Sequence, residues 1–520
     1  MRHLTATVFG AVAGALAAST ILLGGADAKT FRTALRADPA MIDPITNSEI
    51  VAGDILKNVY ESFTSVSGEG KVSPALATSW ETIDNGNGFR FHLRKGVKFH
   101  SGRELSAKDV KFTFETMLTP SMKGGSAVVY LKNVKGAQEM LDGKAKDAPG
   151  IVVIDDNTVD IHLAVKDVLF PIYPFLIMDS AVMAEQGPEW FNKVSAGTGP
   201  FKSIAWKRGV SVTLEAHKAY WGGAPTVDGV SMPIVPSSDT ALSMYDAGDI
   251  DFLYVPENIV SRVLGDPRYK AELIESPRAQ ARYLGMNQSL YAPFKDKRVR
   301  EAISLSIDRP GMIKGLYKGA AFQLNGQITP GVAGFDPKNV PPLKFDPERA
   351  KKLLVEAGLP GGKGMPPVDI QSTEIFKDEI TYYANQLKRV LGMEVNVKIV
   401  ERGTHIKQMN AGEVAFFPWG WTADYPDGLY YLSQMWYGPS PYNRARYKNP
   451  DYDRLIEKAQ ATAADAERYK IYHEAERVLM ADWATAPLPI PAVVALRKPN
   501  VKNVTVTPFG YSPFNKIQIN

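Results

Sequence analysis

The sequence predicts an α/β protein built from two lobes. Its first half is rich in short alternating strands, whereas strands alternate with longer helices after Tyr283, which is the pattern of a parallel or mixed sheet flanked by helices. The tail at residues 503–509 returns to β character, so we expect it to rejoin the first half. A chain that crosses twice between its lobes forms a hinge of at least two strands, with a ligand cleft between the lobes.

The elements of the first half follow from periodicity and turn residues, taken in chain order. Apolar side chains recur on one side of residues 48–63, which predicts a helix. The alternating stretches TSWETI and FRFHLR flank DNGNG between residues 78 and 94, which predicts a β-hairpin. Ser106 with Asp109 three residues later forms a capping box, with Asp in place of Glu, and predicts a helix through Met117.

Further strands follow, and they later alternate with helices. Two short strands are expected between Ile151 and Leu163, and SAGTGPF at residues 195–201 predicts a tight turn into a strand that VSVTLEA follows. Past Tyr283 the strands RYLGMNQ, PVDIQST and EVNVKI alternate with helical patterns. The expected helices of this half lie at residues 296–317, 347–357, 376–391, 451–461 and 465–483.

Composition is that of a globular chain long enough for two or three domains, with 520 residues, 45% apolar and 22% charged. The net charge of +4 is spread along the sequence without a run of Lys or Arg, so nucleic acid is not an expected partner. The sequence contains no Cys, which excludes disulfides, thiolate metal sites, a cysteine nucleophile and lipid attachment through cysteine.

The first 28 residues predict a cleaved export signal. Arg2 and His3 precede a run at residues 4–26 without an acid, Lys or Arg, and Ala26-Asp27-Ala28 has the small-x-small pattern that signal peptidase recognises. An uncleaved membrane anchor is the alternative, because the uncharged run is almost long enough to span a bilayer. We expect cleavage after Ala28 and a lipid-free protein in the periplasm.

Patterns for catalysis and metal binding are missing from the sequence. His473-Glu474 lacks the second His of HExxH, and GVSVT and GVSMP lack the closing Gly of GxSxG. Gly197-Thr198-Gly199 precedes Pro200 and a strand, whereas a phosphate cradle needs a helix N-terminus at that point. The His residues are dispersed along the chain, so neither a metal nor a cofactor is expected.

Aromatic residues concentrate in one segment, residues 416–447, which has 11 in 32 positions, where an average composition gives about three. Aromatic walls with a few placed polar groups are what a small-molecule pocket needs. Core packing explains part of the segment, since Phe416-Phe417 suit a buried strand and Asp427 suits a turn. Asp424 directly follows the aromatic strand and is costly to bury unpaired, so we expect it to face a cation such as a ligand ammonium.

Several motifs, in this order along the chain, carry a resemblance to a known family. The sequence resembles the family 5 extracellular solute-binding proteins of ABC importers, the group that includes dipeptide, oligopeptide, nickel and opine binders. The resemblance covers essentially the whole chain after the signal. It is carried by IDP at Ile42, NVYES at Asn58, SPALATSWE at Ser73, FRFHLRKGVKFHSGRELSAKDVKFTFE from Phe89, GTGPF at Gly197, MNQSLYAPFKDKRVREAISLSIDR from Met286, and WTADYPD at Trp421.

The resemblance implies an α/β, two-lobe periplasmic binding protein (type II, cluster C) with an extra subdomain inserted in the first lobe. Such a protein closes around its ligand, and the absence of Cys agrees with its free periplasmic form. The implied division is a signal peptide at 1–28, lobe I at 29–47, its inserted subdomain at 48–185, lobe I again at 186–282, lobe II at 283–485 and a return to lobe I at 486–520.

The resemblance also implies a set of ligand-binding residues. In peptide-binding members, the Asp of the W-x-A-D motif pairs with the ligand α-amino group, and that position is Asp424 here. The backbone of Gly420 and Thr422 would pair with the ligand like an added strand, and Trp421 would wall a side-chain pocket. The further residues implied at the site are Trp419, Tyr425, Ser48, Glu49, Ile50 and Tyr130. The motif often ends in Pro where this chain has Gly428, so we expect the following loop to differ.

We therefore expect a monomeric, noncatalytic binding protein for a small polar solute. It would capture a di- or oligopeptide-like ligand by hinge closure and deliver it to the permease and ATPase of an inner-membrane ABC importer. An opine, a sugar or oligosaccharide, or a metal chelate is an alternative ligand. Alternatives of another class are a periplasmic hydrolase with Asp424 and Asp427 as paired carboxylates, and a chaperone or receptor-docking protein.

Overall fold

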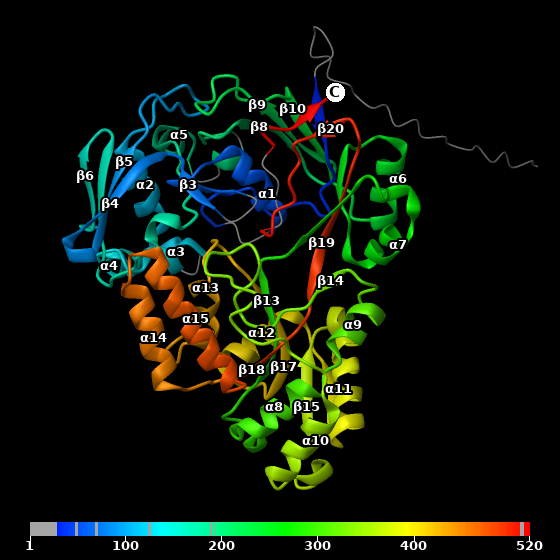
Figure 1. Cartoon of the computed structure of the whole chain (residues 1–520). Coiled ribbons are helices and arrows are strands. Elements are labelled where there is room, and N and C mark those ends of the chain that lie inside the picture. The colour runs from blue at the N-terminus through cyan, green and yellow to red at the C-terminus, as the bar shows by residue number, and fades with distance from the viewer. Residues whose placement is uncertain are drawn as a thin grey trace, which may run out of the picture.

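Figure 1 shows the computed structural model of the protein, which describes residues 29–46, 50–67, 71–122, 126–187, 190–192, 194–509 and 514–520. The expected signal peptide, Ser48 and Glu49 lie outside these described residues. The chain forms two lobes, drawn one above the other, and long strands run between them (Figure 1).

The upper lobe contains two sheets that combine distant parts of the chain. One has the strand order β1-β10-β9-β8, with β1 parallel to β10, and the other places β19 between β11 and β12. Helices α6 and α7 pack against the second sheet through a shared apolar cluster. These elements are β1 (Thr30–Arg32), β8 (Phe201–Lys207), β9 (Ser211–Ala216), β10 (Gly229–Pro233), α6 (Ser238–Ala247), β11 (Phe252–Tyr254), α7 (Val260–Gly265), β12 (Leu273–Pro277) and β19 (Ile490–Arg497).

A third sheet, with the order β4-β5-β7-β6, lies beside these in the upper lobe (Figure 1). The predicted hairpin is confirmed as β4 and β5, which are joined through Asp84 and Asn85, both with positive φ. The predicted capping box is also confirmed, because the Ser106 N–H donates to the Asp109 carboxylate at 2.9 Å. The elements of this part are β2 (Thr64–Val66), β3 (Val72–Pro74), β4 (Ala77–Ile83), β5 (Gly88–Leu93), α2 (Ala107–Met117), α3 (Ser126–Leu131), α4 (Ala137–Leu141), β6 (Ile151–Asp155), β7 (Thr158–His162) and α5 (Ser180–Gln186).

Helix α1 (Ile50–Val59) is shorter than the predicted 48–63, and the GTGPF turn closes its end. The Gly199 N–H donates to the carbonyl of Val59 at 3.0 Å. A Cβ on Gly197 would lie 1.9 Å from that same carbonyl oxygen, so only glycine permits the approach. The glycines of this motif therefore serve the packing of α1 against the first lobe.

The lower lobe contains one mixed five-stranded sheet with the order β16-β15-β17-β13-β18. Strands β15 and β16 are parallel, while β13 runs antiparallel to both β17 and β18. Apolar side chains from the strands and from α8, α10 and α11 form its core, as Leu284, Ile370 and Phe416 illustrate. The elements are β13 (Gln280–Met286), α8 (Lys297–Leu305), α9 (Arg309–Gly315), β14 (Ala321–Phe322), α10 (Pro347–Glu356), β15 (Val368–Ser372), α11 (Lys377–Leu391), β16 (Val395–Ile399), α12 (Arg402–Ala411), β17 (Phe416–Thr422), α13 (Leu429–Trp436), α14 (Pro450–Ala461), α15 (Asp465–Ala481) and β18 (Thr485–Pro487).

Two predictions of secondary structure are wrong. The single helix expected at 296–317 is split into α8 and α9, because Pro310 lies in the first turn of α9 and the Asp308 side chain caps it by accepting from the Gly311 N–H at 2.8 Å. The strand expected at 503–509 does not form, since Asn503 has φ of 61° and turns the chain away after β20 (Val501–Lys502). Strand β20 pairs with β21 (Gln518–Ile519) instead.

The chain passes between the lobes twice. Arg278 and Ala279 join β12 of the upper lobe to β13 of the lower lobe, and Leu488 and Pro489 join β18 to β19 on the return. The two connections are adjacent, because the strands on either side of them are paired: β13 with β18 in the lower lobe and β12 with β19 in the upper lobe. Two adjacent strands thus link the lobes, the geometry of a hinge. Within the described ranges, no helix is long and apolar enough to cross a membrane.

Candidate functional site

Strand β17 carries the aromatic stretch and has an edge open to a further strand. Its whole length, Phe416 to Thr422, pairs with β13. On its other edge, β15 pairs with it only where Ile370 meets Phe416. No other described strand pairs with that edge at residues 418–422. Unpaired edge backbone of this kind can accept an extended chain as an added strand.

The two faces of β17 have different neighbours. Gly420 and Thr422 lie on the face of Arg282 and Gln280, where a Cβ on Gly420 would come within 3.0 Å of the Arg282 Cγ. A larger side chain at position 420 would therefore press against Arg282. On the same face, Gln280 Nε2 donates to the Thr422 hydroxyl at 3.3 Å. Trp419 is on the opposite face together with Trp421, and both side chains are half-buried.

Asp424 follows the end of β17 and remains exposed to solvent. The hydroxyl of Tyr130, from α3, donates to its Oδ2. The hydroxyl of Tyr430, from α13, donates to the same oxygen at 3.1 Å. No residue in the described ranges donates a hydrogen bond to Oδ1. The carboxylate is thus held in place from both lobes through one oxygen, while the other oxygen can accept from a ligand.

A row of four tyrosine rings in tilted and edge-to-face contact lies next to Asp424. The ring centroids are 4.6 Å apart for Tyr130 and Tyr173, 4.9 Å for Tyr173 and Tyr425, and 5.0 Å for Tyr425 and Tyr430. Burial raises the pKa of the Tyr130 and Tyr430 hydroxyls well above 10, so both keep their protons and can donate to the carboxylate. Tyr425 itself is buried within this row of rings.

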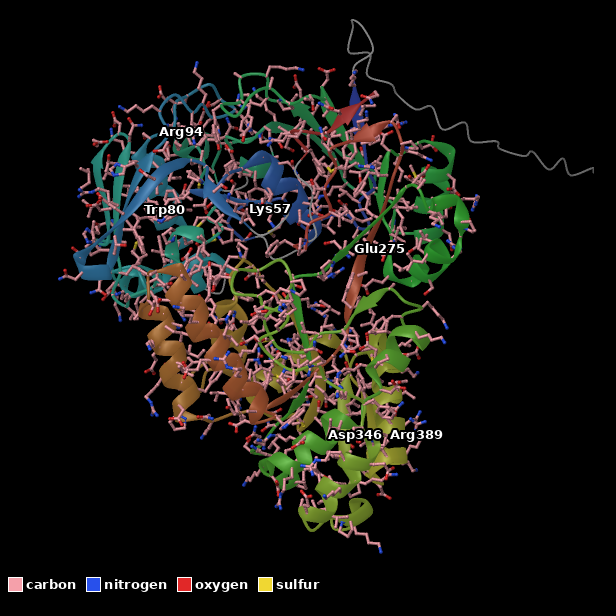
Figure 2. All side chains as sticks on the ribbon, in the orientation of Figure 1. Lys57, Trp80, Arg94, Glu275, Asp346 and Arg389 are labelled. Carbon is pink, nitrogen blue, oxygen red and sulfur yellow. The ribbon has the colours of Figure 1, made fainter. Side chains whose placement is uncertain are left out.

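Helix α1 of the upper lobe contributes a charged residue whose electrostatic interaction reaches Asp424. Figure 2 shows Lys57 on this helix in the upper lobe. Its side chain reaches solvent, yet desolvation lowers the pKa of its ammonium while the charges of Asp54 and Asp424 raise it. Burial raises the pKa of Asp54 to about 7. Lys57 and Asp424 therefore act on each other electrostatically across the space between the lobes.

Asp427 has surroundings quite unlike those of Asp424. It is 2% exposed, its Oδ1 accepts from the Leu429 N–H at 2.8 Å, and its Oδ2 lies 3.7 Å from the Arg468 guanidinium. Burial raises its pKa to about 6. The expected turn at Asp427 is present. The Asp427 carboxylate also forms a buried ion pair with Arg468, just before α13 begins. The two carboxylates do not face one common space, which disfavours the paired-carboxylate hydrolase.

The remaining predicted residues are distributed as follows. Trp419, Gly420, Trp421 and Thr422 occupy the last four positions of β17, and Ala423 separates them from Asp424. Ile50 begins α1, and its side chain, like Ser48 and Glu49, lies outside the described residues. Sequence reasoning missed Tyr430 and Lys57, which act on Asp424, and Tyr173, which contacts the ring of Tyr130. The aromatic count of residues 416–447 includes Tyr430, but no local signal marks the other two.

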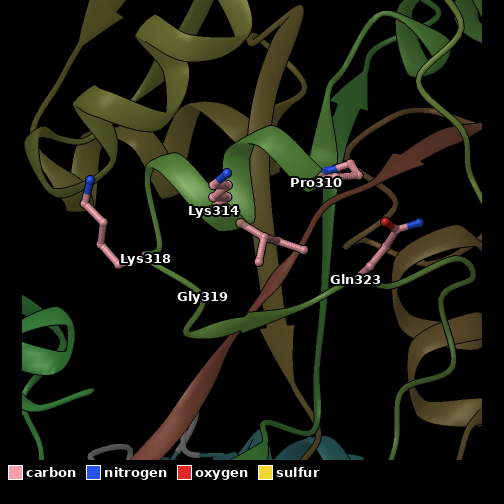
Figure 3. Close-up of a pocket in the computed structure, with 6 residues that line it drawn as sticks. Pro310, Lys314, Lys318, Gly319 and Gln323 are labelled. Carbon is pink, nitrogen blue, oxygen red and sulfur yellow. The ribbon is translucent and has the colours of Figure 1, made fainter. Parts of the chain in front are cut away.

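Two hollows lie near these elements. A small one of about 150 Å³ is lined by residues of both lobes, and these include Tyr130, Tyr173, Tyr425 and Leu429. A more open hollow of about 530 Å³ lies along α9 and the turn after it (Figure 3). It is lined by Pro310, Ile313, Lys314, Lys318, Gly319 and Gln323, none of which contacts Asp424. The residues around Asp424 and the open β17 edge therefore form the candidate site.

Comparisons with known proteins agree with this arrangement. Residues 71–443 match the family described as bacterial extracellular solute-binding proteins, family 5 middle. The chain is 29% identical over 482 residues to heme-binding protein A of Haemophilus influenzae, covering 87% of this chain and 85% of the relative. It is 27% identical over 529 residues to the probable di/tripeptide-binding protein 5 of Pseudomonas aeruginosa, covering 96% and 98%.

Among solved structures, the chain is similar to the unliganded open form of the periplasmic murein tripeptide binding protein MppA. The TM-score is 0.81 with 24% identity, and the match covers 95% of this chain and 98% of that one. This likeness supports the two-lobe fold. The match over most of the sequence, together with the two-lobe fold, identifies the chain as a member of the bacterial extracellular solute-binding proteins of family 5.

Proposed function

We propose that the protein is the periplasmic substrate-binding component of an ABC importer and that it captures a peptide-like solute. The observation that carries this proposal is the open edge of β17, which leads to Asp424, whose Oδ1 receives no hydrogen bond from a described residue. An extended backbone pairs with such an edge, and a free ammonium pairs with such a carboxylate. A peptide has both groups in one molecule. The names of peptide-binding relatives point to the same ligand class.

The proposed binding mode uses both lobes. The ligand backbone pairs with Gly420 and Thr422, its ammonium binds Asp424, and Trp421 walls the neighbouring side-chain pocket. Contacts with α1 of the upper lobe form only when the lobes approach each other. Because these contacts exist only in the closed state, the ligand shifts the population toward closure about the two linking strands.

The same proposal covers the export of the protein, its division into lobes and its role in transport. The signal peptide at 1–28 is cleaved after Ala28, and the mature protein is a monomer without a lipid anchor. Its lobes divide at the residue boundaries implied by the family resemblance, with the subdomain at 48–185 inserted in lobe I. It delivers the solute to an inner-membrane permease and ATPase and catalyses no reaction.

Isothermal titration calorimetry of the mature protein tests the ligand class. Di-, tri- and tetrapeptides with a free N-terminus are titrated, with their N-acetylated counterparts as matched controls. We expect the free peptides to bind and N-acetylation to weaken binding by about tenfold or more, since it removes the charge-assisted bond to Asp424. Equal affinity for both forms would exclude the contact between Asp424 and the ligand ammonium. If only sugars or opines bound, the proposed peptide class would be wrong.

Heme is the second candidate ligand, because a relative that covers 87% of this chain is named heme-binding protein A. The aromatic faces of Trp419 and Trp421 are suited to a flat apolar ligand. Titration with hemin, followed by its absorbance spectrum, separates the two. Saturable one-to-one hemin binding that peptides do not displace would favour heme over the peptide proposal.

A further inference from the structure

The return connection between the lobes has a proline at every second position. Residues 486–491, which lead from β18 into β19, have the sequence APLPIP. The proline ring fixes φ at about −65°, and the residue before a proline is restricted to extended conformations. Every residue of this run is a proline or directly precedes one. The run therefore favours an extended backbone that has little freedom to bend.

Two buried arginines of the lower lobe hold the backbone of this run. Arg309 Nε donates to the Pro487 carbonyl at 2.7 Å, and Arg282 Nη1 donates to the Pro489 carbonyl at 3.3 Å. The backbone carbonyl of Arg282 also accepts from the Leu488 N–H at 2.9 Å. Arg309 is 1% exposed and Arg282 is 4% exposed, so water does not compete for these bonds freely. The run is thereby fixed to the lower lobe.

Arg282 is itself held by buried neighbours. Its Nη2 forms an ion pair with Glu379 on α11 at 2.6 Å, and its Nη1 donates to the Tyr317 hydroxyl at 2.6 Å. The Tyr317 hydroxyl in turn donates to Glu379 Oε1 at 2.8 Å. A buried ion pair adds little net stability, because desolvation opposes the attraction. Its directional bonds do, however, give the Arg282 side chain one position from which to hold Pro489.

Strand β14 extends this support past the boundary between the lobes. It pairs with β19 where Ala321 meets Pro491 and Phe322 meets Ile490. Figure 1 shows β14 beside β19 at the level between the lobes. Ala320, directly before β14, packs into the apolar cluster of α6 and α7 in the upper lobe. The return connection is therefore supported on both sides of the boundary.

The outgoing connection from β12 to β13 is built differently. The Ala279 N–H donates to the Pro508 carbonyl of the tail at 2.7 Å, while its carbonyl accepts from the Ala423 N–H at the end of β17 at 2.9 Å. The Gln280 N–H donates to the Arg278 carbonyl at 2.7 Å, which closes a three-residue turn centred on Ala279. Neither residue of this connection is a proline or precedes one. The outgoing connection thus already bends at Ala279, where the hydrogen-bond partners change from the tail to the lower lobe.

We propose that the two connections play unequal parts when the lobes move. The return connection at residues 486–491 is a stiff arm, and the lobes rotate about it through changes of the backbone torsion angles at Arg278 and Ala279. A few residues that absorb changes in φ and ψ are what a hinge needs. The inference rests on the closure step of the proposed function and not on the nature of the ligand. A stiff arm confines the lobes to one path, so that groups from both lobes meet a ligand in register.

Pulsed electron spin resonance on the protein stripped of bound solute tests this inference. The chain has no Cys, so Glu185→Cys on α5 and Lys458→Cys on α14, both at exposed positions, carry the only two spin labels. We expect Pro489→Ala combined with Pro491→Ala to broaden the distribution of distances between the labels about twofold, because two fixed φ angles are released.

Pro360→Ala is the matched control, because Pro360 is exposed in a short turn of the lower lobe away from both connections. Losing a proline ring adds freedom to the unfolded chain in the control as in the test variant. Both should therefore lower the midpoint of thermal unfolding, but the control should leave the distance distribution unchanged. A purely structural role of the prolines at 489 and 491 predicts the lower midpoint without the broader distribution.

Hydrogen exchange of the unsubstituted protein, followed by mass spectrometry, compares one buried amide of each connection. The Ala279 N–H bonds to the Pro508 carbonyl, and the Leu488 N–H bonds to the Arg282 carbonyl. Rotation at Ala279 opens the first bond and leaves the second closed. We expect Ala279 to exchange about tenfold or more faster than Leu488.

The outcomes separate the inference from the function on which it rests. If the proline variant has the same distance distribution as the control, or if Leu488 exchanges as fast as Ala279, the stiff arm is wrong and the proposed function stands. If di-, tri- and tetrapeptides leave the distance between the labels in the otherwise unsubstituted protein unchanged, the proposed peptide function is wrong. The comparison of the stripped variants still decides whether residues 486–491 are stiff.

Discussion

Asp424 and Asp427 lie three positions apart in one stretch of sequence, but their surroundings are opposite. Asp424 is exposed between the lobes, where two tyrosine hydroxyls hold one oxygen and leave the other available. Asp427 is buried, accepts from the backbone at the start of α13 and faces Arg468. The comparison shows that neighbours from distant parts of the chain, rather than the local motif, decide whether an aspartate serves a ligand or the fold.

The largest expected effect concerns the stability role of Asp427. Asp427→Ala leaves the Leu429 N–H without its acceptor, and among the described residues it leaves buried Arg468 with only the exposed Asp465 as an ion-pair partner. We expect the free energy of unfolding to fall by about 3 kcal/mol. Urea denaturation measures this value. A loss below about 1 kcal/mol would mean that the ion pair contributes little and that the contrast with Asp424 is overstated.

The binding role of Asp424 gives the next largest effect. Asp424→Asn should weaken the binding of a free-amine peptide by more than about 1.5 kcal/mol, because it removes a charge-assisted hydrogen bond. Its free energy of unfolding should change by less than about 0.5 kcal/mol, since the residue is exposed. Calorimetry and urea denaturation of the same preparations give the two numbers.

Asp369→Asn is the matched control for this prediction, because Asp369 is also exposed and lies on β15 of the same sheet. It should change neither binding nor stability. If Asp424→Asn retained full affinity, Asp424 would have no contact with a charged group of the ligand.

The hydroxyl of Tyr130 offers a finer test of how Asp424 is held. Tyr130→Phe keeps the ring contact with Tyr173 and removes the hydrogen bond to Oδ2. We expect the affinity for the same peptide to fall by about 1 kcal/mol, because the carboxylate loses a positioning donor. Tighter binding by this variant would instead show that the hydroxyl competes with the ligand for Asp424.

The pH dependence of stability is the least direct of these tests, and it reports on the protonation of Asp427. Burial raises the pKa of Asp427 from 3.8 to about 6 in the folded protein. A raised carboxyl pKa contributes stability that is complete below the unfolded pKa and is lost as the pH rises through the folded pKa. Asp427→Asn should therefore lose less stability than wild type between about pH 4 and pH 7. Parallel profiles in thermal unfolding would contradict the raised pKa.

Much of the fold follows from local sequence, because capping, turn residues and periodicity act within a few positions. The Ser106 and Asp109 capping box and the hairpin at Asp84 and Asn85 are examples. The split between α8 and α9 had a local signal, Asp308 before Pro310, which the apolar periodicity on both sides obscured. The missing strand at 503–509 had none, since the left-handed turn at Asn503 depends on how the tail packs.

The candidate site was predictable only in part. An acid after an aromatic strand pointed to Asp424, and the family resemblance pointed to Tyr130, which is 294 positions away and donates to it. The field of Lys57 from α1 depends on contacts between remote segments, which periodicity does not encode. Whether Asp424, Trp421 and the other predicted residues contact a ligand stays a prediction.

Mass spectrometry of the small molecules released on denaturing the protein purified from its native periplasm tests the central claim most directly. The account predicts a peptide-like solute with a free amine. The same solute, added back to the stripped protein, should bind wild type and bind Asp424→Asn more weakly. Release of a neutral sugar, or of a solute that both proteins bind equally well, would contradict it.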